Sequence, residues 1–131
     1  MGFAASMLDE DGLRVTDDGF ELDIHPNWYR SLPLSSVTTV DLTVNGERIA
    51  KEEIAFSVNG AEHGLEELAE RYDETWFVLD PATLRVRRQL VRRDESVDVW
   101  VRLRNRIPYL LIGPDRPLES VTEAARTLVA S

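Results

Sequence analysis

Short alternations of apolar and polar residues, separated by turn residues, constrain this chain more than any other feature. The clearest alternation runs from residue 97 to 106. It places Val97, Val99, Val101 and Leu103 on one side and Asp98, Trp100, Arg102, Arg104 and Arg106 on the other. A period of two residues predicts a β-strand with one buried face. A slip of one residue would bury the arginines, so the register is well specified.

Turn signals divide the chain into segments of strand length. They are Asp17-Asp18-Gly19, Asn45-Gly46, Asn59-Gly60, Asp80-Pro81, Arg93-Asp94-Glu95 and Gly113-Pro114. An Asn-Gly pair between alternating runs is a strong hairpin signal. We therefore predict an all-β fold, an antiparallel β-sandwich, in a single domain spanning residues 1–131. We expect residues 1–12 to form a flexible N-terminal arm.

Three segments depart from this pattern. Leu65, Leu68, Ala69 and Tyr72 have helical spacing, which predicts one short helix at about residues 65–72. Residues 76–79 are continuously apolar, as expected of a strand buried on both faces. The last residues contain both a capping-box spacing and good helix formers, while "RTLVA" is equally compatible with a final strand.

Composition excludes several classes of function. The chain has no cysteine, so it has no disulfide, thiolate metal site or cysteine nucleophile. Its net charge of −9 opposes nucleic-acid binding, which requires a basic surface. The absence of a basic-then-apolar leader and of a long apolar run leads us to expect a cytoplasmic protein without a membrane span. The arginines between residues 85 and 106 form either a solvated sheet face or a surface for an acidic partner.

Catalytic signatures are missing from the sequence. The two histidines, His25 and His63, lie in different segments and lack a second metal ligand at suitable spacing. We expect His25 to be a surface or interface residue and His63 to be a turn or cap residue. Adjacent carboxylates such as Glu52-Glu53 fall at turns, where solvation is the ordinary role. We therefore expect no catalytic residue, no cofactor and no metal ion on this chain.

Two irregular segments carry more aromatic and apolar residues than a solvated connection needs. Residues 28–33 and 104–109 both combine arginine, an aromatic residue and proline, which is the composition of interface hot spots. Prolines hold such segments in shape and so reduce the entropy lost on binding. The predicted partner interface consists of Trp28, Tyr29, Arg30, Leu32, Pro33, Arg104, Arg106, Pro108 and Tyr109.

The segments "FELDIHPNWYRSLPLSSV", "VDLTVNGERI", "IAFSVNG" and "VDVWVRLRNRIPYL" resemble, in this order, the β subunit of the bacterial C-glycoside deglycosidases. The resemblance covers roughly residues 13 to 112, and "YRSLPLS" is its most specific element. The end of the chain reads as more helical than the family suggests.

The resemblance implies a β-sandwich that associates tightly with a larger α subunit, a TIM-barrel protein that binds a divalent metal ion, Mn or Mg. Such pairs act on a 3-oxo-C-glycoside substrate of flavonoid or anthraquinone type. They cleave the C–C bond between the 3-oxo-sugar and the aromatic aglycone by elimination. The acid–base residues and the metal belong to the α subunit. The segments at Trp28 and Tyr109 would then dock on the barrel.

Two other functions are compatible with the same residues. A carbohydrate-binding β-sandwich module would also expose Trp and Tyr. A nucleic-acid-binding barrel could stack bases on Trp100 beside Arg102 and Arg104. The net charge opposes this second alternative.

Overall fold

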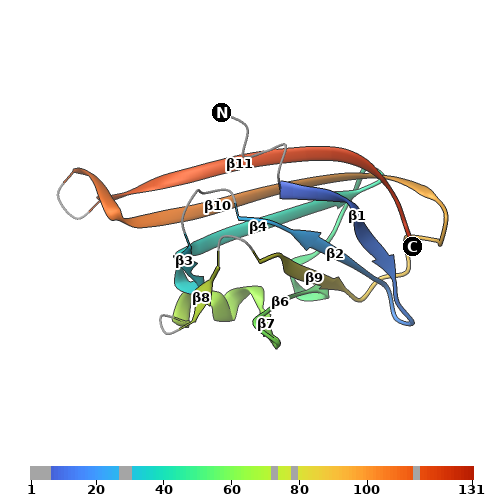
Figure 1. Ribbon diagram of the computed structural model, residues 1–131, viewed down its shortest axis with the longest axis horizontal. Helices are drawn as coiled ribbons and strands as arrows, with labels where there is room; N and C mark the ends of the chain where they lie inside the picture. Colours follow the sequence, from blue (N-terminus) through green and yellow to red (C-terminus); the bar gives the residue numbers. More distant parts are fainter. Residues whose placement is uncertain (1–6, 27–30, 72–73, 78–79, 114–115) are drawn as a thin grey trace.

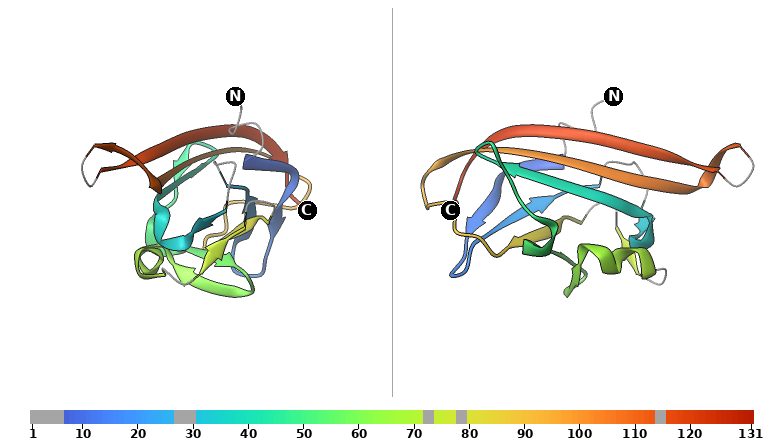
Figure 2. Two further views of the ribbon diagram at one scale, coloured as in Figure 1. Left: turned by 60° about the vertical axis from the view of Figure 1, so that its left-hand side comes forward. Right: turned by 180° about the vertical axis from the view of Figure 1, so that it is seen from behind.

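The computed structural model describes residues 7–26, 31–71, 74–77, 80–113 and 116–131, with the backbone alone described for residues 107–113 and 116–118. Two antiparallel sheets pack face to face, which confirms the predicted all-β sandwich (Figures 1 and 2). A two-stranded ribbon lies at one end of the sandwich. No helix in the described part of the chain is long and apolar enough to cross a membrane.

The first sheet has five strands in the order β1-β2-β9-β6-β7. Their bounds are Leu8–Val15, Phe20–Ile24, Ala82–Val86, Ile54–Val58 and Ala61–Gly64. The second sheet has four strands in the order β11-β10-β4-β5. Their bounds are Arg116–Val129, Ser96–Gly113, Val37–Val44 and Glu47–Arg48. The small ribbon pairs β3 (Leu32–Pro33) with β8 (Thr75–Trp76).

Alternation along the strands builds one core between the two sheets. The apolar row of β10, from Val97 to Leu103, is buried as the sequence predicts. It shares one contiguous cluster of buried side chains with Phe20 of β2 and Phe56 of β6. Phe56 meets Trp76 edge to face, with ring centroids 5.3 Å apart. Burial of one face of every long strand therefore sets the register of both sheets.

The two Asn-Gly pairs form the hairpins that they predict. Asn45 and Gly46 have φ values of 50° and 79°, and Asn59 and Gly60 have φ values of 55° and 79°. Two consecutive positive φ angles define the turn whose twist suits an antiparallel hairpin. These turns connect β4 to β5 and β6 to β7.

The short helix is present, but it is a 3₁₀-helix. It is η3 (Leu65–Glu70), and two further one-turn 3₁₀ segments are η1 (Leu34–Ser36) and η2 (Lys51–Glu53). A 3₁₀-helix has three residues per turn, so residues i and i+3 share a face and i+4 does not. Leu68 is accordingly buried and Leu65 packs against the core, whereas Ala69, expected on the apolar face, is exposed.

The structure defines the first and the last strand of the chain. Residues 1–6 lie outside the described residues, but Met7 and Leu8 are buried and strand β1 begins at Leu8, so the predicted arm does not extend to residue 12. The sequence left the C-terminal segment open between a helix and a strand, and the structure shows that it is strand β11 (Arg116–Val129). The residues after β11 connect the two sheets, because Ser131 donates a backbone hydrogen bond to Leu13 of β1 and accepts one from Val15 of the same strand.

The apolar run from residue 76 to 79 was also interpreted wrongly. Only Trp76 is buried in a strand, and Phe77, the next residue, is 52% exposed. Residues 78–79 lie outside the described residues. The ribbon of β3 and β8 is two residues long on each side, so it buries one ring and leaves the following one at the surface.

The hairpin of β10 and β11 extends beyond the end of β4, the other strand that pairs with β10. Strand β4 ends its pairing with β10 at Val37, opposite Asn105. The hairpin continues past this point through Arg106 opposite Glu119 to Gly113 opposite Arg116, with two irregularities in register. It therefore projects beyond the body of the sandwich (Figures 1 and 2). We call residues 107–113 and 116–118 the arm.

Gly19 provides a test of how tightly the first hairpin packs on β9. A Cβ atom at this position would collide with the backbone carbonyl of Val86 and lie 2.7 Å from the backbone nitrogen of Arg88. Backbone atoms cannot move aside as a flexible side chain can. We expect Gly19→Ala to reduce the free energy of unfolding by about 3 kcal/mol or more, measured by urea denaturation.

Gly46→Ala is the matched control, because its φ is positive and nothing lies within 4 Å of the added Cβ atom. It should cost only about 1 kcal/mol. Equal losses for the two variants would contradict the packing described for Gly19.

Candidate partner interface

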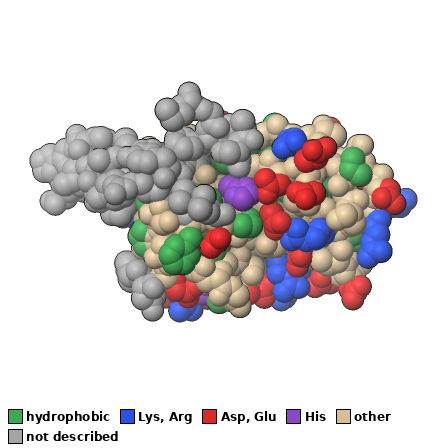
Figure 3. Space-filling view, viewed as in Figure 1, with side chains coloured by type: hydrophobic (Ala, Val, Ile, Leu, Met, Phe, Trp, Pro, Cys, Tyr) green, Lys and Arg blue, Asp and Glu red, His purple; other side chains and the backbone are tan. Residues whose placement is uncertain are grey.

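The outer face of the five-stranded sheet is a network of internal ion pairs. Arg14 of β1 donates to both carboxylate oxygens of Asp23, at 2.8 and 2.9 Å, and Asp23 also accepts a 2.7 Å hydrogen bond from Thr83. Arg85 bridges Glu21 and Glu62, at 3.0 and 3.3 Å. Figure 3 shows the intermingled acidic and basic side chains on this side of the molecule. Both arginines are paired with carboxylates of the same sheet, so these ion pairs link neighbouring strands of the fold.

Hydrogen bonds from Arg14 hold the pKa of Asp23 below its usual range, and they raise the pKa of Arg14. Burial opposes both shifts, which means that the ion pair outweighs the desolvation of its groups. The cause of both shifts is thus structural, namely the ion pair between β1 and β2.

At the centre of the outer face of the four-stranded sheet, charged side chains are also paired within the chain. Asp41 of β4 is buried and accepts hydrogen bonds from Arg102 at 2.9 and 3.0 Å. Arg102 also lies 5.8 Å from the ring centroid of Trp100, whose indole nitrogen donates to Glu123. Arg102 is thus neutralised within the chain, and this opposes the nucleic-acid interface suggested by Trp100, Arg102 and Arg104.

The histidines are separate from each other and each faces a carboxylate. Nε2 of His25 lies 2.6 Å from Asp9 Oδ2. His63 is 5% exposed and lies 3.4 Å from Glu74 Oε2. His63 is part of β7, so its assignment to a turn or cap was wrong. Among the described residues, no three His, Cys, Asp or Glu side chains gather in a way that could hold a metal ion.

The first predicted interface segment is only partly described. Trp28, Tyr29 and Arg30 lie outside the described residues. Leu32 is 2% exposed and pairs with Trp76, and Pro33 is half-buried beside it. In the isolated chain Leu32 therefore supports the segment from inside and does not present a contact surface.

The second predicted segment lies at the base of the arm and along it. Arg104 is half-buried and Arg106 is exposed, both on the outer face of β10. In the described part of the chain, no carboxylate oxygen lies within 4.0 Å of a nitrogen of either arginine, in contrast to Arg102 two residues earlier. Pro108 and Tyr109 belong to the arm, for which the backbone alone is described.

Two exposed apolar residues next to these segments, Phe77 and Val121, were not among the predicted interface residues. Phe77 directly follows Trp76, the partner of Leu32, so it adjoins the first segment. Val121 is 48% exposed and lies opposite Arg104 on β11. Phe77 lies in a continuous apolar run, which predicted a buried strand. The exposure of Val121 could be predicted only once residues 116–129 were known to form a strand.

Comparisons with known proteins give a consistent result. A family model described as C-glycoside deglycosidase beta subunit matches residues 3–109. A C-glycoside deglycosidase beta subunit of Arthrobacter globiformis is 32% identical over 125 residues, which cover 95% of each chain. A 3'-dehydrocarminate deglycosidase beta subunit of Microbacterium sp is 36% identical over 111 residues, or 85% of this chain and 83% of that one. A further C-glycoside deglycosidase beta subunit, of Microbacterium trichothecenolyticum, is 29% identical over 95% of this chain and 94% of its own.

The ion pair of Asp23 with Arg14 predicts a specific dependence of stability on pH. Asp23→Asn should lower the free energy of unfolding by about 2 kcal/mol at pH 7, because it leaves the guanidinium without its carboxylate. The folded-state pKa of Asp23 is lowered, so its contribution is complete above the unfolded pKa of about 3.9 and is lost as the pH falls through the folded pKa. The difference between wild type and variant should therefore shrink towards zero in acid.

Urea denaturation between pH 7 and pH 2 measures this difference. Asp11→Asn is the control, because Asp11 is exposed on the same strand. It should leave stability nearly unchanged at every pH. A difference between wild type and Asp23→Asn that stays constant down to pH 2 would contradict the assignment.

Proposed function

The chain belongs to the C-glycoside deglycosidase beta subunit family, and from this premise we propose that it is the accessory subunit of a hetero-oligomeric C–C lyase. The enzyme is proposed to cleave the bond between a 3-oxo-sugar and an aromatic aglycone of flavonoid or anthraquinone type. Its larger subunit, a TIM barrel, supplies the catalytic groups. Membership of a family of β subunits is the observation that carries this proposal, since a β subunit requires a partner subunit.

In the proposed elimination, the larger subunit can supply every reacting group, so this chain needs none. A ketone at C3 of the sugar acidifies the proton on the neighbouring carbon. A base removes that proton, and the electron pair forms a double bond as the aglycone carbon leaves and takes up a proton. In this proposal the base, the proton donor and a divalent metal ion, Mn²⁺ or Mg²⁺, belong to the barrel. The described residues of this chain contain no cluster suited to the metal, and no step is assigned to them.

The role proposed for this chain is to stabilise the barrel and to shape the surroundings of its active site. The docking surface consists of residues 28–30, Phe77, Arg104, Arg106, Val121 and the arm. Apolar and aromatic residues supply the contact energy, while the two arginines meet carboxylates of the barrel. Without a partner, a ribbon of two strands projecting into water is only marginally stable, which supports the arm as a docking element. We place the assembled enzyme in the cytoplasm.

A carbohydrate-binding module is the second candidate, favoured by one feature. A hollow of about 320 Å³ beside Trp100 is lined also by Thr43, Asp98 and Thr127, which could bind sugar hydroxyls next to a stacking ring. This candidate requires the isolated chain to bind sugars. Titration calorimetry with glucosides, in the absence of a barrel partner, decides between the two.

Co-expression with the α subunit of the same enzyme tests the first proposal. The two chains should purify as one complex, and the complex should release the aglycone from a 3-oxo-C-glucoside. The α subunit alone should be at least tenfold slower, and this chain alone should be inactive. An α subunit that is fully active alone, or two chains that purify separately, would refute the proposal.

Reversal of charge at the base of the arm tests the docking surface. The double variant Arg104→Glu, Arg106→Glu should weaken association at least a hundredfold, because it places acids where we expect carboxylates of the partner. The double variant Arg92→Glu, Arg93→Glu makes the same change of net charge at exposed positions outside the proposed surface and should associate as the wild type does. Surface plasmon resonance measures both. Equal affinities for the two variants would exclude this surface, provided that both retain the circular dichroism spectrum of the wild type.

A further inference from the structure

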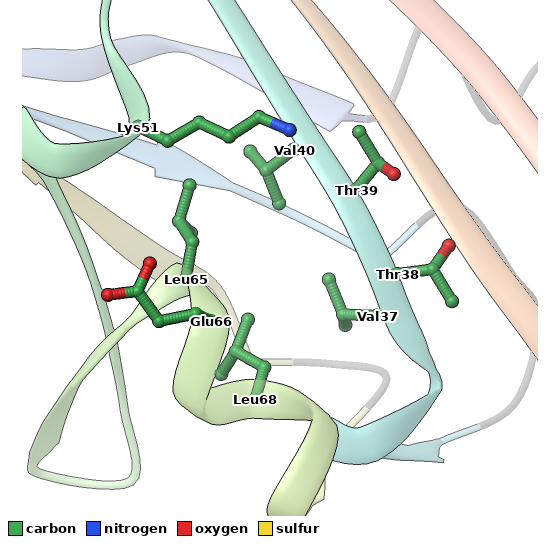
Figure 4. Close-up of a pocket in the computed structure, with 8 residues that line it drawn as sticks. All are labelled: Val37, Thr38, Thr39, Val40, Lys51, Leu65, Glu66 and Leu68. Atoms are coloured by element: carbon green, nitrogen blue, oxygen red, sulfur yellow. The ribbon is translucent and has the colours of Figure 1, made fainter.

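A hollow between β4 and η3 lies beside the proposed docking surface. Its volume is about 180 Å³. Figure 4 shows the side chains that line it, which are Val37, Thr38, Thr39 and Val40 of β4, Leu65, Glu66 and Leu68 of η3, and Lys51 of η2. Val37 lies opposite Asn105, where the base of the arm begins. The hollow and the arm are therefore at the same end of the four-stranded sheet.

The edge of β4 next to this hollow has no strand beside it in the described part of the chain. Strand β5 pairs with β4 only at Thr43 and Val44. The carbonyl of Leu42 faces the same edge, since it accepts a hydrogen bond from Ile49. Backbone groups of alternate residues point to the same edge, so those of Val40 face the hollow. An exposed strand edge of this kind can pair with an extended segment of another chain.

The hollow is apolar at one end and cationic at the other. Val37 and Leu68 line the apolar end, while the side chain of Lys51 extends across to β4 near Val40 and Thr39 (Figure 4). The carboxylate of Glu66 points away from the ammonium group (Figure 4). Among the described residues, no carboxylate oxygen lies within 4.0 Å of that ammonium. Lys51 is the only lysine of a chain that has a net charge of −9.

We propose that this hollow binds an extended segment of the α subunit that carries an aliphatic residue followed by a carboxylate. The aliphatic side chain fills the space between Val37, Leu65 and Leu68. The backbone of the segment pairs with Val40, and its carboxylate binds Lys51. This inference rests on the proposed function, because it takes the α subunit as the partner.

A second copy of this chain is a poorer occupant. An isologous contact between two β4 edges has each edge meeting its own equivalent. The ammonium group of Lys51 lies near Val40, so a two-fold axis there would bring the two cations together. Like charges placed opposite each other across paired strands are destabilising. A partner with a carboxylate at this point has the complementary charge.

Because the chain has a single lysine, acetylation provides a direct test. The free chain and the complex with the α subunit are treated with acetyl N-hydroxysuccinimide, and mass spectrometry follows the modification of Lys51. We expect acetylation to be at least tenfold slower in the complex. A carbodiimide, which joins an amine to a carboxylate in contact with it, should link Lys51 to an Asp or Glu of the α subunit. Equal acetylation rates in a stable complex, or a link only to Glu66 of the same chain, would overturn the inference.

Substitutions complete the test. Lys51→Glu should weaken association at least tenfold and Lys51→Arg should leave it nearly unchanged, with Arg93→Glu as the control for a change of two charges elsewhere. Unchanged affinity of Lys51→Glu would also overturn the proposed site. If the wild-type chains form a complex, either result concerns the hollow alone; if they do not, the proposed function has failed as well.

Discussion

One strand, β10, is the constraint on which the rest of the structure depends. Its inward row, Val97 to Leu103, belongs to the core, and its outward row carries Trp100 and the arginines. The same backbone pairs with β4 on one side and β11 on the other. A shift of register by one residue would bury the arginines and expose the valines, so the core fixes which side chains reach the surface. The outward position of Arg104 therefore follows from the packing of the inward row of the same strand.

Among the described residues, some cations are paired with carboxylates of the same chain, and others are not. Arg14, Arg85 and Arg102 each meet carboxylates of their own chain. At the base of the arm and at Lys51 the described residues supply no such partner within 4.0 Å. In an acidic chain, a cation such as Arg104, which lies opposite the exposed Val121 and has no such partner among the described residues, has the chemistry of a binding surface. This pattern supports both the proposed docking surface and the proposed binding of a carboxylate by Lys51.

Local sequence patterns were sufficient to predict some structural elements but not others. The Asn-Gly turns and the alternation in β10 depend on neighbouring residues, so the sequence alone predicted them. Strand β11 could not be predicted, because Ala124, Ala125 and Leu128 suit a helix and only pairing with β10 selects a strand. The exposure of Phe77 follows from the shortness of the ribbon, and the hollow at Lys51 needs β4, η2 and η3 to meet. These features arise from contacts between distant segments, which local patterns do not contain.

Replacement of the arm most directly tests whether this chain docks on an α subunit through the proposed surface. The arm lies beyond the pairing of β10 with β4, so its removal should not disturb the core. Arg106 and Glu119 lie opposite each other, so a two-residue Asn-Gly turn can replace residues 107–118 and leave both sheets intact. The dissociation constant of this variant with the α subunit is the quantity to measure. We expect an unchanged unfolding midpoint and a loss of affinity of at least a hundredfold. A variant that binds the α subunit as tightly as the full chain does would contradict this docking.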